Sequence, residues 1–198
     1  MRRNHSHISF ILDRSGSMES LRREAIGGFN AFVDSQRLEP GTADLSLILF
    51  DHEYLPTLEN VDMKRVPHLT DETYVPRGTT ALHDAIGRTI DDLGVQLAGL
   101  PESKRPEKVI VAILTDGLEN ASSRYTPRKV AQMIAHQREK YSWEFVFLGA
   151  NQDAILTAQQ LSIDPAAAYS FAPTAQGVAE AYGSLNREIS MRRRMPRN

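Results

Sequence analysis

The chain has 198 residues and 41% hydrophobic content, which is enough to bury a full core and is typical of one domain. Its 23 basic and 25 acidic side chains leave a formal net charge of −2, so no overall charge attracts nucleic acid or a membrane surface. Cysteine is absent, which excludes disulfides, thiolate zinc sites and cysteine nucleophiles. We predict a single domain over residues 1–198, with a core from about 6 to 190 and a basic tail over 191–198.

The beginning of the chain is polar and lacks the apolar stretch of a signal peptide. No segment approaches the roughly 20 consecutive apolar residues of a membrane-spanning helix. These features predict a cytoplasmic location, with neither nucleic acid nor membrane as a partner. An excised domain of a secreted protein would have the same features.

Short apolar runs rich in Val, Ile, Leu and Phe predict four strands, at residues 8–12, 45–50, 109–114 and 145–149. The runs are nearly continuous rather than alternating, which indicates strands buried on both faces, as in a parallel sheet covered by helices. Apolar residues recur at steps of three and four between them and predict helices over 18–32, 82–97, 130–134 and 178–189. This alternation predicts a three-layer α/β/α domain, Rossmann-like and doubly wound, with a mainly parallel sheet.

One segment interrupts the alternation. In FDHEYLPTL, residues 50–58, a polar turn of three residues follows the second strand and precedes residues that favour extended structure. We predict a hairpin whose second arm is an antiparallel edge strand, because Pro56 lacks a backbone donor and is tolerated at an edge. A short strand is also predicted within 166–171, before a final helix that Pro173 and Thr174 would start.

Two aspartates end predicted strands. Asp13 follows the first apolar run and Asp116 follows the third. Because ligands of open parallel sheets gather beyond the carboxyl ends of the strands, these carboxylates are expected to face each other at the same edge. Alone, they would repel and raise each other's pKa, so a positive charge is expected between them.

Hydroxyl side chains accompany these aspartates. Ser15 and Ser17 follow Asp13 around the turn, and Thr79 and Thr80 open the helix at 82–97. Oxygen-only ligands favour hard divalent cations, and Mg²⁺ in particular prefers an octahedral shell that retains several waters. The sequence therefore predicts a magnesium site.

The blocks DRSGS at 13–17, GTTALHDAI at 78–86 and LTDG at 114–117 resemble the metal-ion-dependent adhesion site of von Willebrand factor A domains. The resemblance covers nearly the whole chain, because the order of predicted elements also agrees. It implies that Ser15, Ser17 and Thr80 bind the metal directly, while Asp13 and Asp116 act mostly through bound waters. Thr80 is chosen over Thr79 because it stands six residues before Ile86, the spacing of the family. The implied metal is Mg²⁺, with Mn²⁺ or Ca²⁺ as alternatives.

The resemblance implies a protein-binding module rather than an enzyme. Neutral hydroxyl ligands leave the cation much of its charge, and in the family an Asp or Glu of a partner protein fills the open position. Arg14 and Arg77 are expected to favour such an acidic partner. The chain is most similar to compact stand-alone bacterial members, which implies an AAA+ ATPase or another component of the same system as partner.

Other interpretations compete with this one. Ser17 and Thr80 could cap helices, Ser15 could make a local turn bond, and the two aspartates could serve turns. A Mg²⁺-dependent phosphohydrolase or phosphotransferase of the aspartate-nucleophile type also begins with a strand that ends in aspartate. Such enzymes resemble haloacid dehalogenases and need a second carboxylate where this chain has Ser15, and no lysine follows in the expected place. A third alternative is a scaffold with a vestigial metal site.

Several further residues have a structural and a functional interpretation. Asn151 and Asp153 follow a predicted strand and either border the site or, as we expect, cap the next helix. His5 and His7 have a spacing seen in zinc sites, but without a matching downstream pair we expect them to be satisfied or to face solvent. His83 is expected to lie in its helix, with a role at the binding face as the alternative. The arginines at both ends are expected to be solvated.

Overall fold

The computed structural model describes residues 1–150 and 154–195, and its central feature is a sheet of strand order β3-β2-β1-β4-β5-β6. Its strands are β1 Arg2–Asp13, β2 Thr42–Phe50, β3 Tyr54–Asp62, β4 Pro106–Thr115, β5 Glu144–Gly149 and β6 Ala168–Ser170. All neighbours are parallel except β2 and β3. The predicted hairpin is therefore present, and Pro56 lies in β3 at the sheet edge.

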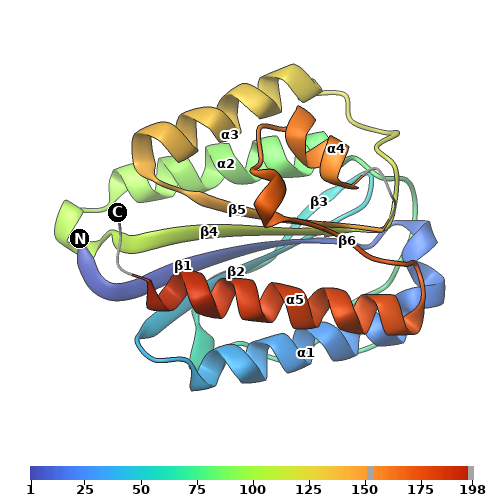
Figure 1. Cartoon of the computed structure of the whole chain (residues 1–198), viewed down its shortest axis with the longest axis horizontal. Coiled ribbons are helices and arrows are strands. Elements are labelled where there is room, and N and C mark those ends of the chain that lie inside the picture. The colour runs from blue at the N-terminus through green and yellow to red at the C-terminus, as the bar shows by residue number, and fades with distance from the viewer. Residues whose placement is uncertain (151–153, 196–198) are drawn as a thin grey trace.

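Helices cover both faces of the sheet. They are α1 Arg22–Leu38, α2 Leu82–Gly99, α3 Pro127–Tyr141, α4 Ala154–Gln160 and α5 Ala175–Arg194, with short 3₁₀ turns η1 Gly16–Leu21, η2 Met63–Arg65, η3 Glu102–Lys104 and η4 Pro165–Ala167. In Figure 1, α1 and α5 lie side by side below the sheet and α2, α3 and α4 lie above it. The predicted three-layer fold with one antiparallel edge strand is confirmed.

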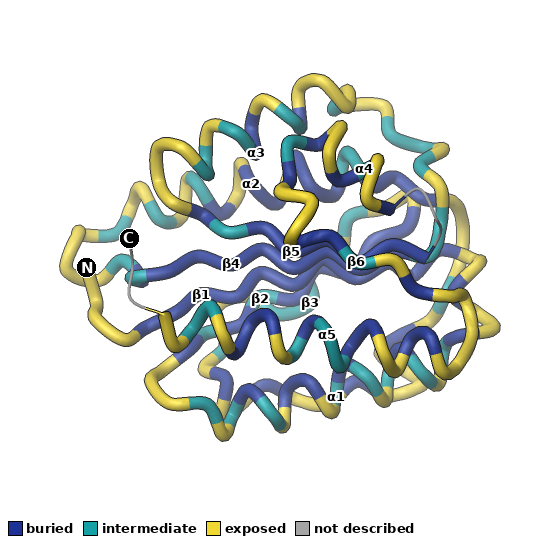
Figure 2. Tube along the Cα trace, in the orientation of Figure 1, coloured by how far each residue is buried: buried dark blue, intermediate teal, exposed yellow. Residues whose placement is uncertain are grey.

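The apolar strands are buried on both faces, as their continuous pattern indicates (Figure 2). On the face of α1 and α5, the Phe10 ring packs edge-on against Phe29 and Phe32 and stacks on Tyr182, with centroids 6.2 Å apart in the last pair. A second core lies under α2, α3 and α4 and includes Ile11 and Val111. The two cores hold the strand ends in a fixed arrangement.

The observed elements differ from the predicted ones at some boundaries. The helix predicted from residue 18 begins as the 3₁₀ turn η1 and becomes α-helical at Arg22. The weak strand predicted within 166–171 is β6, and Thr174 caps α5 by accepting a hydrogen bond from the Gly177 N–H at 3.1 Å. Helix α4 lacked a clear periodic pattern in the sequence, so no range was predicted for it beyond the expectation of a helix following Asn151 and Asp153.

The folded region is longer than predicted at both ends, since β1 begins at Arg2 and α5 ends at Arg194. The prediction of a basic tail is therefore wrong for residues 191–194. The reason is pairing: Arg192 bonds to Glu144 and Glu188, Arg193 bonds to Gln36, and Arg194 bonds to Glu39. The Lys108 ammonium adds to this by donating to main-chain carbonyls at the end of α5.

No helix within residues 1–150 and 154–195 combines the length and the apolar character needed to cross a bilayer.

Helices α1 and α5 approach closely, so alanine substitutions at two adjacent glycines of α1 should change the free energy of unfolding in opposite directions. A Cβ on Gly28 would lie 2.1 Å from the Tyr182 ring, whereas a Cβ on Gly27 would meet nothing within 4 Å. We expect Gly28→Ala to lower the free energy of unfolding by about 1–2 kcal/mol through overpacking. Gly27→Ala should raise it by up to about 1 kcal/mol through helix propensity. Urea denaturation of both variants checks this, and equal effects would contradict the packing described.

Candidate functional site

The two strand-end aspartates lie at the carboxyl edge of the sheet on neighbouring strands, β1 and β4. Asp13 is the last residue of β1 and is fully buried, and Asp116 directly follows β4. The Ser17 hydroxyl donates to Asp116 Oδ1 at 2.6 Å, and the Ser15 and Ser17 hydroxyl oxygens are 3.1 Å apart. The turn after β1 is therefore joined to the end of β4 by polar side chains.

Thr80 belongs to the same cluster, and Gly117 shows this most clearly. A Cβ added at Gly117 would lie 2.6 Å from Thr80 Oγ1 and 3.4 Å from Ser15 Oγ. Both hydroxyls thus face the space beside Gly117, immediately after Asp116. Only a residue without a side chain leaves that space open.

Of the two candidate threonines, Thr80 is buried and Thr79 is exposed. The main chain of Thr80 is fixed from two sides, because its N–H donates to Asn120 Oδ1 at 2.9 Å and its carbonyl accepts from the Asn120 N–H at 3.0 Å. The structure therefore brings together the hydroxyls of Ser15, Ser17 and Thr80 beside Asp116.

Helix capping does not account for these hydroxyls. Ser15 is the N-cap residue of η1 but makes no side-chain capping bond, and Ser17 lies inside η1. The N-cap residue of α2 is Ala81, so Thr80 does not cap that helix. The alternative in which these residues only terminate helices is contradicted by the described part of the chain.

The Asp13 carboxylate lies beneath the hydroxyls and is held by both strands. Its Oδ1 accepts from the Ser15 N–H at 2.6 Å, and its Oδ2 accepts from the Thr115 hydroxyl at 2.5 Å. Its main-chain carbonyl accepts from the buried Tyr74 hydroxyl, also at 2.5 Å. Asp13 therefore does serve a turn, as the alternative interpretation held, and the same hydrogen bonds orient its carboxylate.

Burial makes this carboxylate pair electrostatically unfavourable. Burial raises the pKa of Asp13 to about 6, even though the bonds from Thr115 and Ser15 lower it, and the nearby Asp116 charge raises it further. Burial also raises the pKa of Asp116, against the lowering effect of Ser17. A cation between the two would relieve both penalties. The described residues include no cluster of three or more His, Cys, Asp or Glu that could hold a metal, so a cation here would depend on hydroxyl oxygens.

Sequence reasoning missed three residues that build the site. Thr115 precedes Asp116 at the strand end, and its position one residue before a candidate ligand was an available signal. Asn120 lies four residues beyond Asp116, in a loop whose conformation the sequence did not indicate. Tyr74 approaches Asp13 from a long loop, and no local sequence pattern indicated this contact.

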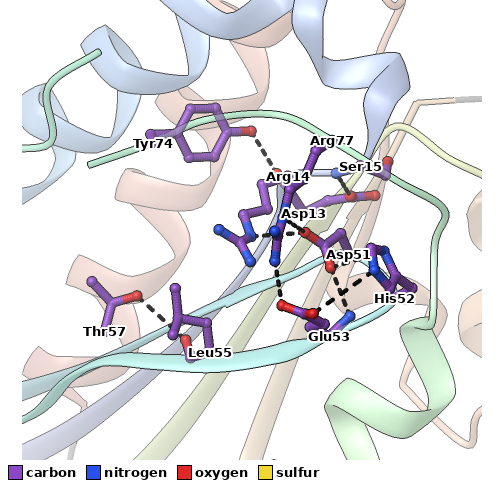
Figure 3. A network of polar contacts seen from close by, with 10 residues as sticks. All are labelled: Asp13, Arg14, Ser15, Asp51, His52, Glu53, Leu55, Thr57, Tyr74 and Arg77. Carbon is purple, nitrogen blue, oxygen red and sulfur yellow. Dashed lines mark hydrogen bonds and ion pairs between the residues drawn. The ribbon is translucent and has the colours of Figure 1, made fainter. Parts of the chain in front are cut away.

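From their positions in the sequence, Arg14 and Arg77 were expected to favour an acidic partner. In the structure both side chains point toward Asp51 instead (Figure 3). Arg14 is buried, and its Nε lies 3.1 Å from Asp51 Oδ2. The Arg77 Nε donates to the same oxygen at 2.9 Å, and its terminal nitrogen bonds to Glu53. Both guanidinium groups are thus paired within the chain.

The remaining predicted residues lie away from the oxygen cluster or support it indirectly. His83 Nδ1 lies 3.4 Å from Glu119 Oε2. His5 is buried and satisfied, because it bonds to Thr42 at 2.7 Å and to Asp44 at 2.8 Å. The capping prediction for Asn151 and Asp153 falls outside the described residues.

Comparison with solved structures identifies the fold as that of von Willebrand factor A domains. The vWF domain of the pilus tip protein Mfa5 from Porphyromonas gingivalis has a TM-score of 0.66 and 12% identity, covering 98% of this chain and 97% of that one. The mussel byssus protein PTMP1, with a zinc-occupied MIDAS motif, has a TM-score of 0.65 and 14% identity over 94% of this chain and 46% of that one. The manganese-loaded TRAP protein of Plasmodium vivax has a TM-score of 0.63 and 17% identity over 91% and 73%.

At these identities the likeness concerns the fold. The chain spans less than half the length of the mussel protein. No protein-family model matches the sequence, and no curated protein matches it.

The buried His7, two residues after His5 in β1, predicts a pH dependence of the free energy of unfolding. Burial lowers the pKa of His7 to about 4, partly offset by Asp44, so the native state resists protonation of His7 while the unfolded chain binds a proton near pH 6.5. This histidine therefore lowers the free energy of unfolding by about 1.4 kcal/mol per pH unit as pH falls from 6.5 toward 4. We expect His7→Leu to have a shallower decline than wild type or Ser9→Ala in urea denaturation at several pH values. Parallel declines would contradict the prediction.

Proposed function

We propose that this domain binds a protein partner through a divalent cation held at the carboxyl edge of the sheet. The proposed ligands are Ser15, Ser17 and Thr80 directly, with Asp13 and Asp116 acting mostly through water. The observation that carries the proposal is the convergence of three hydroxyls, none of which caps a helix, on the buried Asp13 carboxylate and the half-buried Asp116 carboxylate. Oxygen-only ligands favour Mg²⁺, and Mn²⁺ and Ca²⁺ are the alternatives.

Such a cation would supply an open coordination position for an anionic oxygen, here proposed to be an Asp or Glu side chain of the partner. The residues of the chain determine how strongly that position attracts an acid. Neutral hydroxyls as direct ligands leave more positive charge at the site than carboxylates would. Asp13 is bonded to Ser15 and Thr115, which favours its role behind the hydroxyls rather than among them.

The surface beside the site also supports a binding role. Leu118 follows Gly117 and has 68% of its surface exposed, so it offers an apolar contact next to the proposed metal position. Arg14 and Arg77 are paired with Asp51, so their charges do not serve as the main attraction for an acidic partner. Attraction of the acid is therefore assigned to the cation, and affinity should depend strongly on it.

We propose that the domain is not an enzyme. The phosphohydrolase alternative needs a second carboxylate for proton transfer, and Ser15 stands in that position. The scaffold alternative, with a vestigial metal site, is less favoured because all five oxygen-bearing side chains are present and buried or bonded at one edge. An AAA+ ATPase as partner and a cytoplasmic location remain predictions.

Metal binding is expected to stabilise the native state. Mg²⁺ at about 100 times its Kd should raise the free energy of unfolding by about 2.7 kcal/mol, because a ligand that binds only the native state shifts the equilibrium by mass action. Ser15→Ala combined with Ser17→Ala should abolish this increase while the variant stays folded. Thermal unfolding with and without Mg²⁺ measures the effect. Ser20→Ala, an exposed serine one turn further along the chain, should respond like wild type.

Partner binding is expected to depend on the same hydroxyls. In a pull-down with the immobilised domain, a specific partner should be captured in Mg²⁺ and lost in EDTA, and the double serine variant should capture nothing in either condition. The physical reason is that the partner's acid completes the proposed metal shell. Capture that is unchanged in EDTA, or unchanged by the two substitutions, would reject the proposed function.

A further inference from the structure

Asp51 is a fully buried carboxylate that immediately follows β2, next to the turn that carries Ser15. Its Oδ1 accepts from the Glu53 N–H at 2.6 Å, and its Oδ2 accepts from Arg77 Nε at 2.9 Å. The Nε of Arg14 lies 3.1 Å from the same Oδ2, but its direction does not make a hydrogen bond. Asp51 is therefore paired with two arginines at once, as Figure 3 shows, and Glu53 is a second carboxylate partner of Arg77.

These arginines belong to the two segments that carry the proposed hydroxyl ligands. Arg14 stands between Asp13 and Ser15, and Arg77 stands three residues before Thr80. The Asp51 main-chain carbonyl also accepts from the N–H of Ala81, the residue after Thr80, at 2.9 Å. One residue thus contacts both sides of the hydroxyl cluster without belonging to it.

Main-chain bonds join the same two segments directly. The Arg77 N–H donates to the Arg14 carbonyl at 2.8 Å, and the Gly16 N–H donates to the Gly78 carbonyl at 3.1 Å. Gly78 has a φ of +67°, and a Cβ there would lie 2.2 Å from His52 Nδ1, so the approach depends on glycine. The spacing between Ser15 and Thr80 is therefore set by how these two segments are tied together.

Charge explains why Asp51 controls this spacing. A buried guanidinium is tolerated only when it is paired, and Arg14 is 8% exposed. Without the Asp51 carboxylate, Arg14 would have to turn toward water or remain buried without a counter-charge. Because Arg14 is flanked by Asp13 and Ser15, its movement would displace the turn that presents the hydroxyls.

We infer that Asp51 is a positioning residue for the cation site, which fixes the Ser15 turn and the Thr80 segment at the spacing the ion requires. This inference rests on the proposed function. Asp51 touches none of the proposed ligand side chains and acts through Arg14, Arg77 and Ala81. Its loss should therefore weaken metal binding rather than abolish it.

The test is isothermal titration calorimetry with Mg²⁺ on wild type and Asp51→Asn, together with the midpoint of urea unfolding measured without metal. Substitution of groups that orient metal ligands typically lowers affinity 10–100-fold, and we expect a loss in this range. The matched control is Asp44→Asn, which removes a carboxylate within β2 that is paired to a β1 side chain, His5, at the end of the strand opposite to Asp51. It should lower stability but leave Mg²⁺ affinity within about twofold of wild type.

The outcomes separate this inference from the proposed function. If wild type binds none of Mg²⁺, Mn²⁺ and Ca²⁺, the proposed function fails. If wild type binds and Asp51→Asn binds equally well, or if Asp44→Asn weakens binding to the same extent, the positioning role is overturned. Should Asp51→Asn not fold, Arg77→Gln decides, because Arg77 is half exposed and its loss removes the well-aligned bond to Asp51. A Mg²⁺ affinity of Arg77→Gln equal to that of wild type would overturn the inference.

Discussion

Burial of Asp13 beside the half-buried Asp116, at the ends of neighbouring strands, is the constraint on which the candidate site depends. Asp13 is fully buried, and its pKa is raised because water does not reach it, while Asp116 adds a second negative charge nearby. Hydrogen bonds from Thr115, Ser15 and Ser17 reduce this penalty but do not remove it. A compensating positive charge would stabilise the charged form of this pair. The donors around it are neutral and supply no such charge.

Asp51 is another buried carboxylate close by, and side chains of the chain itself compensate its charge. Asp51 receives its positive charge from Arg14 and Arg77, so it is neutralised within the chain. The arginines that could have compensated Asp13 are thereby directed to Asp51. This division leaves the oxygen cluster at Asp13 and Asp116 without a basic side chain among the contacts that the structure describes, which suits a site that accepts a cation.

The rest of the fold supplies rigidity for this edge. β1 and β4 are paired in parallel along most of their length, so Asp13 and Thr115 meet at a fixed separation. The aromatic cluster of Phe10, Phe29, Phe32 and Tyr182 holds α1, and with it the η1 turn, against the sheet. At the opposite end, Lys108 and the arginine pairs fasten α5 down to Arg194. The hydroxyls are thus carried on elements with little freedom to move apart.

The sequence by itself determined the layers and the antiparallel edge strand, because continuous apolar runs and helical periodicity are local patterns, and its strand-end aspartates and nearby hydroxyls indicated the side chains proposed for the candidate site. It could not determine which arginines stay available, since Arg14 and Arg77 meet Asp51 only after β1, β2 and the long loop are assembled. Nor could it find Tyr74 and Asn120, whose partners lie 61 and 40 residues away. Only the tertiary structure decided these contacts, because a charge or a hydrogen-bond donor has no fixed partner until folding brings distant segments together.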